Sequence, residues 1–288
     1  MKMRMLAGLL LFVALVSCGK TGPQEPPVAT PSLSVNHARV PLGSPVEMKF
    51  KFVVAPGAKI DHDYSVFVHF LDNAREMMWA DDHLPSVPTS QWKPGQTIEY
   101  TRMMFAPVYP YVGEATIEVG LYLPTVGTRL VLSGNDRGHQ SYEVTKFELL
   151  PQTENIFLIY KDGWYPTEVP ADNPAAEWQW TKKEATLAFR NPKRDVTFFL
   201  NVGGQPLLLG ETQTVSVRIG DQVIDTFQVK EDVLKRIPFT AAQLGTGEMI
   251  EVKIAVDKPF VPALVPALKN RDDRELGVRI LHAFIEPK

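Results

Sequence analysis

Aromatic side chains that could stack on a sugar ring are concentrated in one stretch of the second half of the chain. Trp164 and Tyr165 follow a glycine, and Trp178 and Trp180 lie two residues apart farther on. A sugar ring stacks on an indole because its C–H groups meet the negative π face. Trp164 and Tyr165 lie in a predicted loop and are the better binding candidates. Trp178 and Trp180 share one face of a predicted strand, which favours core packing.

A charged run precedes the last predicted strand. Asp272, Asp273, Arg274 and Glu275 offer ligands for hydroxyl groups or a calcium ion. The alternative is a structural ion pair, in which the forked guanidinium of Arg274 holds a carboxylate and locks the last strand. We favour the structural role, and Arg274 stays a candidate ligand-binding residue beside the four aromatic ones.

Histidine and carboxylate residues cluster once, at His69, Asp81, Asp82 and His83. Zinc needs three or four convergent ligands, and no His-x-x-x-His or comparable spacing supports a site here. We therefore predict neither a metal nor a cofactor. Serine-based catalysis also lacks a motif, because no Gly-x-Ser-x-Gly sequence occurs.

Composition limits the remaining classes of function. The chain has 288 residues with 30 Lys and Arg against 33 Asp and Glu. This balance lacks the excess of positive charge that is typical of nucleic-acid-binding proteins, so we predict no nucleic-acid partner. A single Cys excludes an intrachain disulfide framework and Cys-rich zinc sites. The length suits about two domains of ordinary size.

The amino terminus resembles a bacterial lipoprotein signal. Lys2 and Arg4 precede an apolar run that is too short to span a bilayer, and the run ends Leu15-Val16-Ser17-Cys18. This ending is similar to a lipobox, which implies removal of residues 1–17 and acylation of Cys18. The alternative is an ordinary secretory signal with a chance Cys. The resemblance implies a membrane anchor, and Gly19 in place of Asp favours the outer membrane.

Two all-β domains are predicted after this signal. Residues 18–31 hold the acylated Cys and a Pro-rich tether, because prolines are frequent there and large apolar residues are nearly absent. Short runs in which apolar and polar residues alternate, broken by Pro, Gly, Asn and Asp, predict two antiparallel β-sandwiches. The first covers 32–150 and is expected to be Ig-like with about seven strands. The second covers 151–288 and is expected to be jelly-roll-like. The strands with the clearest alternation are 46–54, 64–71, 97–105, 115–123 and 142–149, then 156–160, 184–190, 195–202, 213–219, 222–229, 249–256 and 277–286.

Three weaker features of the second half are also predicted. Residues 229–236 fit a short helix or a bulged strand, and Thr240 to Gly245 fits one capped helical turn. Gly220 and Asp221 indicate a tight hairpin turn. Residues 257–274 are predicted as a loop because prolines exclude a central strand.

The second half also resembles a known module. Four segments carry the resemblance: Gly163-Trp164-Tyr165, Trp178-Gln179-Trp180-Thr181, the Pro-rich 258–266 and the run from Asp272 to Arg279. They are similar to noncatalytic jelly-roll modules that accompany bacterial glycosyltransferases and phosphoglycerol transferases. Those modules are themselves similar to carbohydrate-binding modules. The first half is similar to sandwich segments found beside such enzymes. The resemblance implies a glycan-binding surface without a catalytic centre.

We therefore expect a lipid-anchored, noncatalytic envelope protein that presents a binding surface to a glycan or to an envelope polysaccharide assembly. One alternative is a structural or assembly lipoprotein that binds other envelope proteins. Another is a polysaccharide hydrolase or lyase, which needs two carboxyl groups about 5–10 Å apart. Asp81 with Asp82 and Asp272 with Asp273 are candidates for that role by residue type alone.

Overall fold

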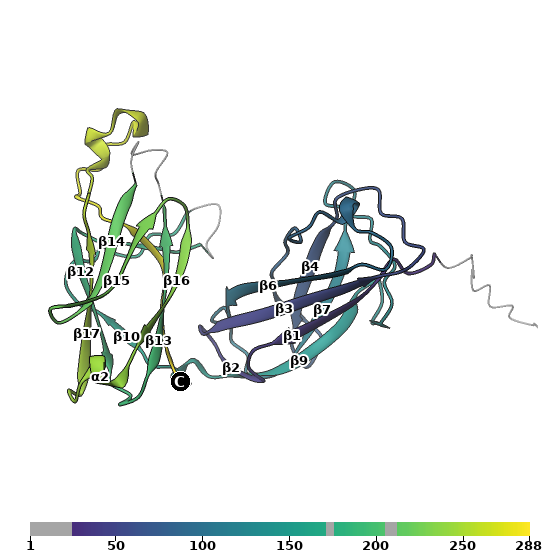
Figure 1. The fold of residues 1–288 in the computed structure, drawn as a ribbon, viewed down its shortest axis with the longest axis horizontal. Helices are drawn as coiled ribbons and strands as arrows, with labels where there is room; N and C mark the ends of the chain where they lie inside the picture. The colour runs from purple at the N-terminus through teal and green to yellow at the C-terminus, as the bar shows by residue number, and fades with distance from the viewer. Residues whose placement is uncertain (1–24, 171–175, 205–211) are drawn as a thin grey trace, which may run out of the picture.

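The chain folds into two β-sandwiches. A computed structural model describes residues 25–170, 176–204 and 212–288, so Cys18 and the predicted signal lie outside the described residues. Each sandwich has its own cluster of buried apolar side chains. The two sandwiches lie side by side along the long axis of the molecule (Figure 1). The predicted fold class, two tandem antiparallel β-sandwiches, is confirmed.

The first sandwich has a small sheet and a larger one. The small sheet has the order β1-β3-β6, with β1 Ala29–Val35, β3 Pro45–Val54 and β6 Thr97–Phe105. The larger sheet has the order β2-β9-β7-β4-β5, with β8 paired to β9; its strands are β2 Arg39–Pro41, β4 Ser65–Leu71, β5 Met77–Ala80, β7 Gly113–Tyr122, β8 Asn135–Asp136 and β9 Tyr142–Leu150.

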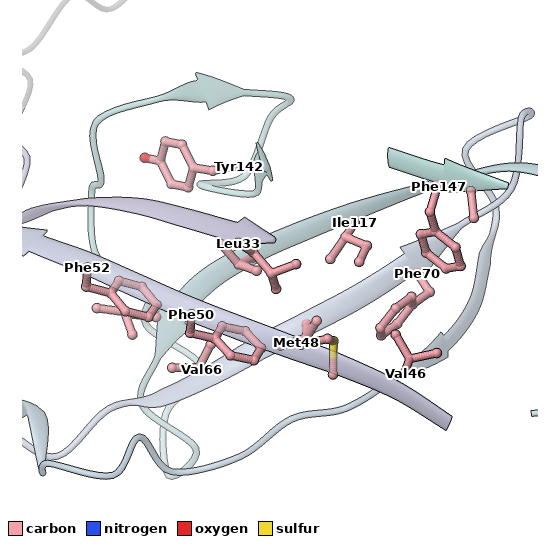
Figure 2. Packing of buried hydrophobic residues seen from close by; sticks show 14 of the residues in the cluster. Leu33, Val46, Met48, Phe50, Phe52, Val66, Phe70, Ile117, Tyr142 and Phe147 are labelled. Atoms are coloured by element: carbon pink, nitrogen blue, oxygen red, sulfur yellow. The ribbon is translucent and has the colours of Figure 1, made fainter. Parts of the chain in front are cut away.

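Strand β3 shows why the alternating pattern specifies this sandwich. Met48, Phe50 and Phe52 are fully buried on its inner face. They pack between the sheets with Phe70 and Ile117 (Figure 2). Each such side chain contributes about 1.5–3 kcal/mol relative to leaving it exposed, so a shift of one residue in register would reverse a large stabilisation.

The first sandwich departs from the prediction in three ways. It has nine described strands instead of about seven, because β2 and β8 are only three and two residues long. Strand β2 pairs with β9 in parallel. Strand β1 begins at Ala29, inside the predicted tether that ended at Pro31. Pro31 is accommodated because β1 is an edge strand, where a missing N–H costs no ladder hydrogen bond.

The second sandwich pairs a five-stranded and a four-stranded sheet. The first has the order β10-β12-β17-β14-β15, with β10 Leu158–Tyr160, β12 Glu184–Arg190, β14 Gln213–Ile219, β15 Gln222–Val229 and β17 Met249–Val256. The other has the order β11-β18-β13-β16, with β11 Gln179–Trp180, β13 Val196–Gly203, β16 Val233–Phe239 and β18 Arg279–Pro287.

Local signals in this half are largely confirmed. Helix α2, Ala241–Leu244, begins at a capping box between Thr240 and Gln243 and ends at Gly245. The β14–β15 hairpin turns at Gly220. The segment 229–236 is neither a helix nor one bulged strand: Val229 ends β15, and β16 begins at Val233 after a short connection. Pro238 is tolerated because β16 is an edge strand. No helix in the described parts of the chain has the length and apolar character needed to cross a bilayer.

Side chains from both sandwiches meet at a small junction. Phe105 stacks on His282 with ring centroids 4.2 Å apart. Arg236 forms an ion pair with Glu47 at 2.8 Å. Between the sandwiches the chain passes through the short helix η2, Gln152–Glu154, near the place where the C-terminus lies in Figure 1.

A candidate binding surface on the second sandwich

The segment that carries the predicted aromatic site runs along the free side of β11. Tyr165 N–H donates to the carbonyl of Trp180 at 2.9 Å, and Glu168 exchanges two backbone hydrogen bonds with Trp178. The segment begins at Gly163, whose φ is +85°. A Cβ there would lie 2.0 Å from the carbonyl oxygen of Glu184, so this approach requires glycine.

Two of the four predicted aromatic residues pack within the protein. The indole N–H of Trp164 donates to the carbonyl of Thr186 at 2.8 Å, and the ring packs against the core of the sandwich. Trp180 is 7% exposed and packs edge-on against Phe260. The prediction that Trp164 is a better binding candidate than Trp178 therefore has no support in this geometry, because its indole N–H and its ring are both engaged within the protein.

Arg274 forms the structural lock that we favoured. Its guanidinium donates to Asp272 at 2.6 Å and to Glu168 at 2.8 Å. These hydrogen bonds lower the pKa of the Asp272 carboxyl and raise the pKa of Arg274. The same guanidinium lies 5.0 Å from the ring centroid of Tyr165, whose hydroxyl donates to the carbonyl of Glu275. Arg274 and Tyr165 are thus held by protein contacts.

Trp178 has a different environment, with an arginine that is less fully engaged. Its indole N–H donates to Glu168 at 3.2 Å, and the side chain is partly exposed. The guanidinium of Arg279 lies 5.2 Å from its ring centroid. Arg279 makes one long ion pair, 3.6 Å to Asp232, and its buried Nε has no hydrogen-bond partner among the described residues.

Backbone pairing explains how Arg279 reaches this position. It pairs with Trp180 of β11 on one side and with Gly203 of β13 on the other. A Cβ on Gly203 would lie 2.5 Å from Arg279 Nε, so the missing side chain makes room for the guanidinium. We call Glu168, Trp178 and Arg279 the Trp178 surface. Sequence reasoning did not select Arg279 or Glu168 as site residues, because the strand register that joins them to Trp178 has no local signal.

The Trp178 surface combines an apolar plane with ions of both signs. An indole face can take the C–H face of a sugar ring, and a carboxylate can accept hydroxyl hydrogen bonds. A guanidinium forms paired hydrogen bonds with a carboxylate ligand. The surface can therefore bind a sugar that carries an acidic group.

The two histidines of the predicted cluster in the first sandwich have different neighbours. His83 lies inside, with Nε2 2.8 Å from the Tyr100 hydroxyl, whereas His69 lies beside Phe67. Burial lowers the pKa of both histidines. Within the described residues, no three His, Cys, Asp or Glu side chains are grouped so that they could hold a metal ion.

Three of the four carboxylates proposed for hydrolysis accept hydrogen bonds within the protein. Asp81 receives two hydrogen bonds from Arg102, and Asp82 accepts the N–H of Val68. Asp272 is held by Arg274. Asp273 is exposed, and among the residues that the structure describes only its neighbour Asp272 is held by a side chain in the second pair.

Comparisons with known proteins give no family. No family model matches the chain, and no curated protein matches it. A structure of CBM51-2 in complex with GlcNAc and INT domains, from Clostridium perfringens ZmpB, is 11% identical over 62% of this chain and 39% of its own, with a TM-score of 0.23. Salmonella α-2-macroglobulin reacted with methylamine is 9% identical over 90% of this chain and 15% of its own, with a TM-score of 0.26. The chain spans well under two thirds of either structure, and TM-scores this low support no inference about function.

Proposed function

We propose that this protein is a noncatalytic, lipid-anchored envelope protein whose second sandwich binds an acidic glycan at the Trp178 surface. The observation that carries the proposal is the pairing of a partly exposed indole with Arg279, which the protein itself engages only loosely. Aromatic planes with a few placed polar groups are the usual elements of sugar recognition.

The contrast between two arginines supports this choice of site. Arg274 donates to two carboxylates at 2.6 and 2.8 Å, so its charge is already balanced. Arg279 meets one carboxylate at 3.6 Å, which leaves N–H groups able to turn toward a ligand. A carboxylate ligand would complete the hydrogen bonding of Arg279, and the sugar ring would lie against Trp178.

Calorimetric titration of the mature chain tests the glycan part of the proposal. The probes are a galacturonic acid trisaccharide and the neutral galactose trisaccharide. We expect the acidic sugar to bind more tightly, and we expect Trp178→Ala to weaken it by about ten-fold, which corresponds to about 1.4 kcal/mol. Arg39→Ala, which alters an exposed arginine of the first sandwich, is the control and should leave binding unchanged. Equal binding by the wild type and Trp178→Ala would refute this site.

The lipid anchor is tested separately. The resemblance to a lipobox supports acylation of Cys18, because the Cys has the position and flanking residues that this signal requires. Mass spectrometry of the membrane fraction should find Cys18 as the acylated first residue, and density separation should place the protein with the outer membrane. A Cys18→Ala variant should lose the modification. An unmodified full-length chain in the cytosol would contradict the anchor and the location together.

A further inference from the structure

A cleft of about 270 Å³ lies where the two sandwiches meet. Its apolar part is formed by Ile156, Leu158, Ala283 and Phe284. Phe157, Tyr160, Glu177 and His282 add aromatic and polar groups around this part. Pockets between domains are a preferred place for ligands, because groups from separate elements converge there.

The backbone around the cleft is held by specific contacts. Ile156 forms an isolated bridge with Ile285 of β18, which fixes the start of the segment that carries Phe157 and Tyr160. The side-chain amide of Asn155 donates to the carbonyl of Leu42 in the first sandwich at 2.8 Å. Residues of the first sandwich, including Gly43, complete one side of the cleft.

Exposed aromatic rings distinguish this cleft from the rest of the surface. Phe157 is 55% exposed and Tyr160 is 40% exposed. They are the only exposed rings among the Phe, Tyr and Trp residues that the structure describes, and both line the cleft. Exposed large apolar side chains gathered in a concave site indicate a ligand or partner.

The charge of the cleft selects the kind of ligand. Glu177 is the only acidic side chain that lines it, and no Lys or Arg is present in the lining. The negative charge of Glu177 raises the pKa of both Tyr160 and His282, although burial has the larger effect on each and lowers the pKa of His282 overall. Glu177 therefore places a negative charge in the same lining as Tyr160 and His282, which favours a cationic ligand over an anionic one.

We propose that this junction cleft binds a sugar ring that carries an ammonium group. The ammonium would meet the carboxylate of Glu177 and the faces of Phe157 or Tyr160, because a cation is attracted to an aromatic face and to a carboxylate together. The ring carbons would cover the apolar part of the cleft. The proposal extends the proposed glycan-binding function to a second site, which has the opposite charge preference from the Trp178 surface.

Titration of the mature chain with three disaccharides tests the ammonium preference. The probes are the glucosamine dimer, its fully N-acetylated form and cellobiose, at a pH where the amine is charged. We expect the amine to bind about ten-fold more tightly than the two neutral sugars. Equal binding of all three, or no binding of the amine, would overturn the proposal.

Variants test whether the preference for the amine arises in the cleft. Glu177→Gln should remove the preference for the amine and leave the weak binding of cellobiose, whereas Phe157→Ala should weaken both. Trp178→Ala should leave amine binding unchanged, and Glu177→Gln should leave the acidic trisaccharide unaffected. In the wild type, failure of only the acidic sugar to bind would refute the Trp178 surface, and failure of only the amine to bind would refute the cleft. If Glu177→Gln kept the full preference for the amine, the assignment to this cleft would be wrong even in a folded variant.

Discussion

Arg274 donates a hydrogen bond of 2.8 Å to Glu168 across 106 positions of the sequence. This contact joins the entry of the last strand to the segment that borders β11. Because the same guanidinium also holds Asp272, one side chain ties the loop before β18 to the segment that carries Glu168 of the Trp178 surface. The charged run before β18 is therefore a structural support for the site.

Replacing Arg274 should destabilise the second sandwich. Arg274→Met removes hydrogen bonds to Asp272 and Glu168 and leaves both partly buried carboxylates without their guanidinium partner, so we expect a loss of about 1.5–3 kcal/mol in the free energy of unfolding. Arg39→Met is the matched control, because its ion pair with Glu148 is more exposed and should be worth about 0–1 kcal/mol. Urea unfolding of both variants measures the difference. Equal effects would show that the Arg274 contacts contribute no more than a surface pair.

The same contact predicts a dependence on acid. The pKa of Asp272 is lowered in the folded protein from 3.8, mainly by its hydrogen bond to Arg274. Its contribution to stability is therefore complete above about pH 4 and is lost as the pH falls through the lowered value. Urea unfolding at pH 7 and at pH 3 measures how much free energy of unfolding is lost between the two pH values. This loss should be smaller for Asp272→Asn than for the wild type. An identical loss in both proteins would contradict the coupling.

Gly163 should be far less replaceable than Gly220. Both have positive φ, +85° and +56°, which costs an alanine about 1–2 kcal/mol. A Cβ at Gly163 would also lie 2.0 Å from the backbone oxygen of Glu184, whereas nothing lies within 4 Å of a Cβ at Gly220. We therefore expect Gly163→Ala to lower the free energy of unfolding several-fold more than Gly220→Ala does, as measured by thermal and urea unfolding. Equal effects would mean that the segment shifts freely away from β12.

Alternation made most of the fold predictable. The predicted strands 97–105, 184–190, 213–219, 222–229 and 249–256 match observed strands end to end. Burial alternates most clearly in 213–219 and 249–256, where buried side chains alternate with more exposed ones along most of the strand. Edge strands were harder. Pro31 and Pro238 interrupt the usual strand signal, yet β1 and β16 accept them because each is the last strand of its sheet in the described part of the chain.

The candidate sites were predictable only in part. Sequence reasoning selected Trp178, but the neighbour that gives it a binding environment, Arg279, depends on the register of β11, β18 and β13. Phe157 and Tyr160 looked like ordinary strand residues. Their exposure follows from the position of β10 at a sheet edge beside the junction, which is a property of the tertiary arrangement.

His83 predicts a second, milder dependence on pH. Burial lowers its pKa from 6.5 in the folded state, so the unfolded chain takes up a proton first as the pH falls. Stability should decline from about pH 6.5 downward and should not change above it on account of this group. His83→Gln should reduce the loss of stability measured between pH 7.5 and pH 5, while His139→Gln, at an exposed histidine of the same sandwich, serves as the control. If the variant lost as much stability as the wild type, the pH dependence would come from groups other than His83. His69 and His282 also have a lowered pKa and would then be the next candidates.

Arg279→Lys provides the most specific test of the Trp178 surface. A lysine keeps the positive charge but lacks the planar fork that donates two hydrogen bonds to one carboxylate. If Arg279 binds the acidic group of a sugar, this change should weaken the galacturonic acid trisaccharide by about ten-fold and leave the neutral galactose trisaccharide unchanged. Trp178→Phe should weaken both sugars, because it reduces the stacking plane that they share. The two variants therefore separate charge recognition from ring stacking. Equal loss of both sugars in Arg279→Lys would indicate that the arginine only supports the indole, and retention of both would remove Arg279 from the site.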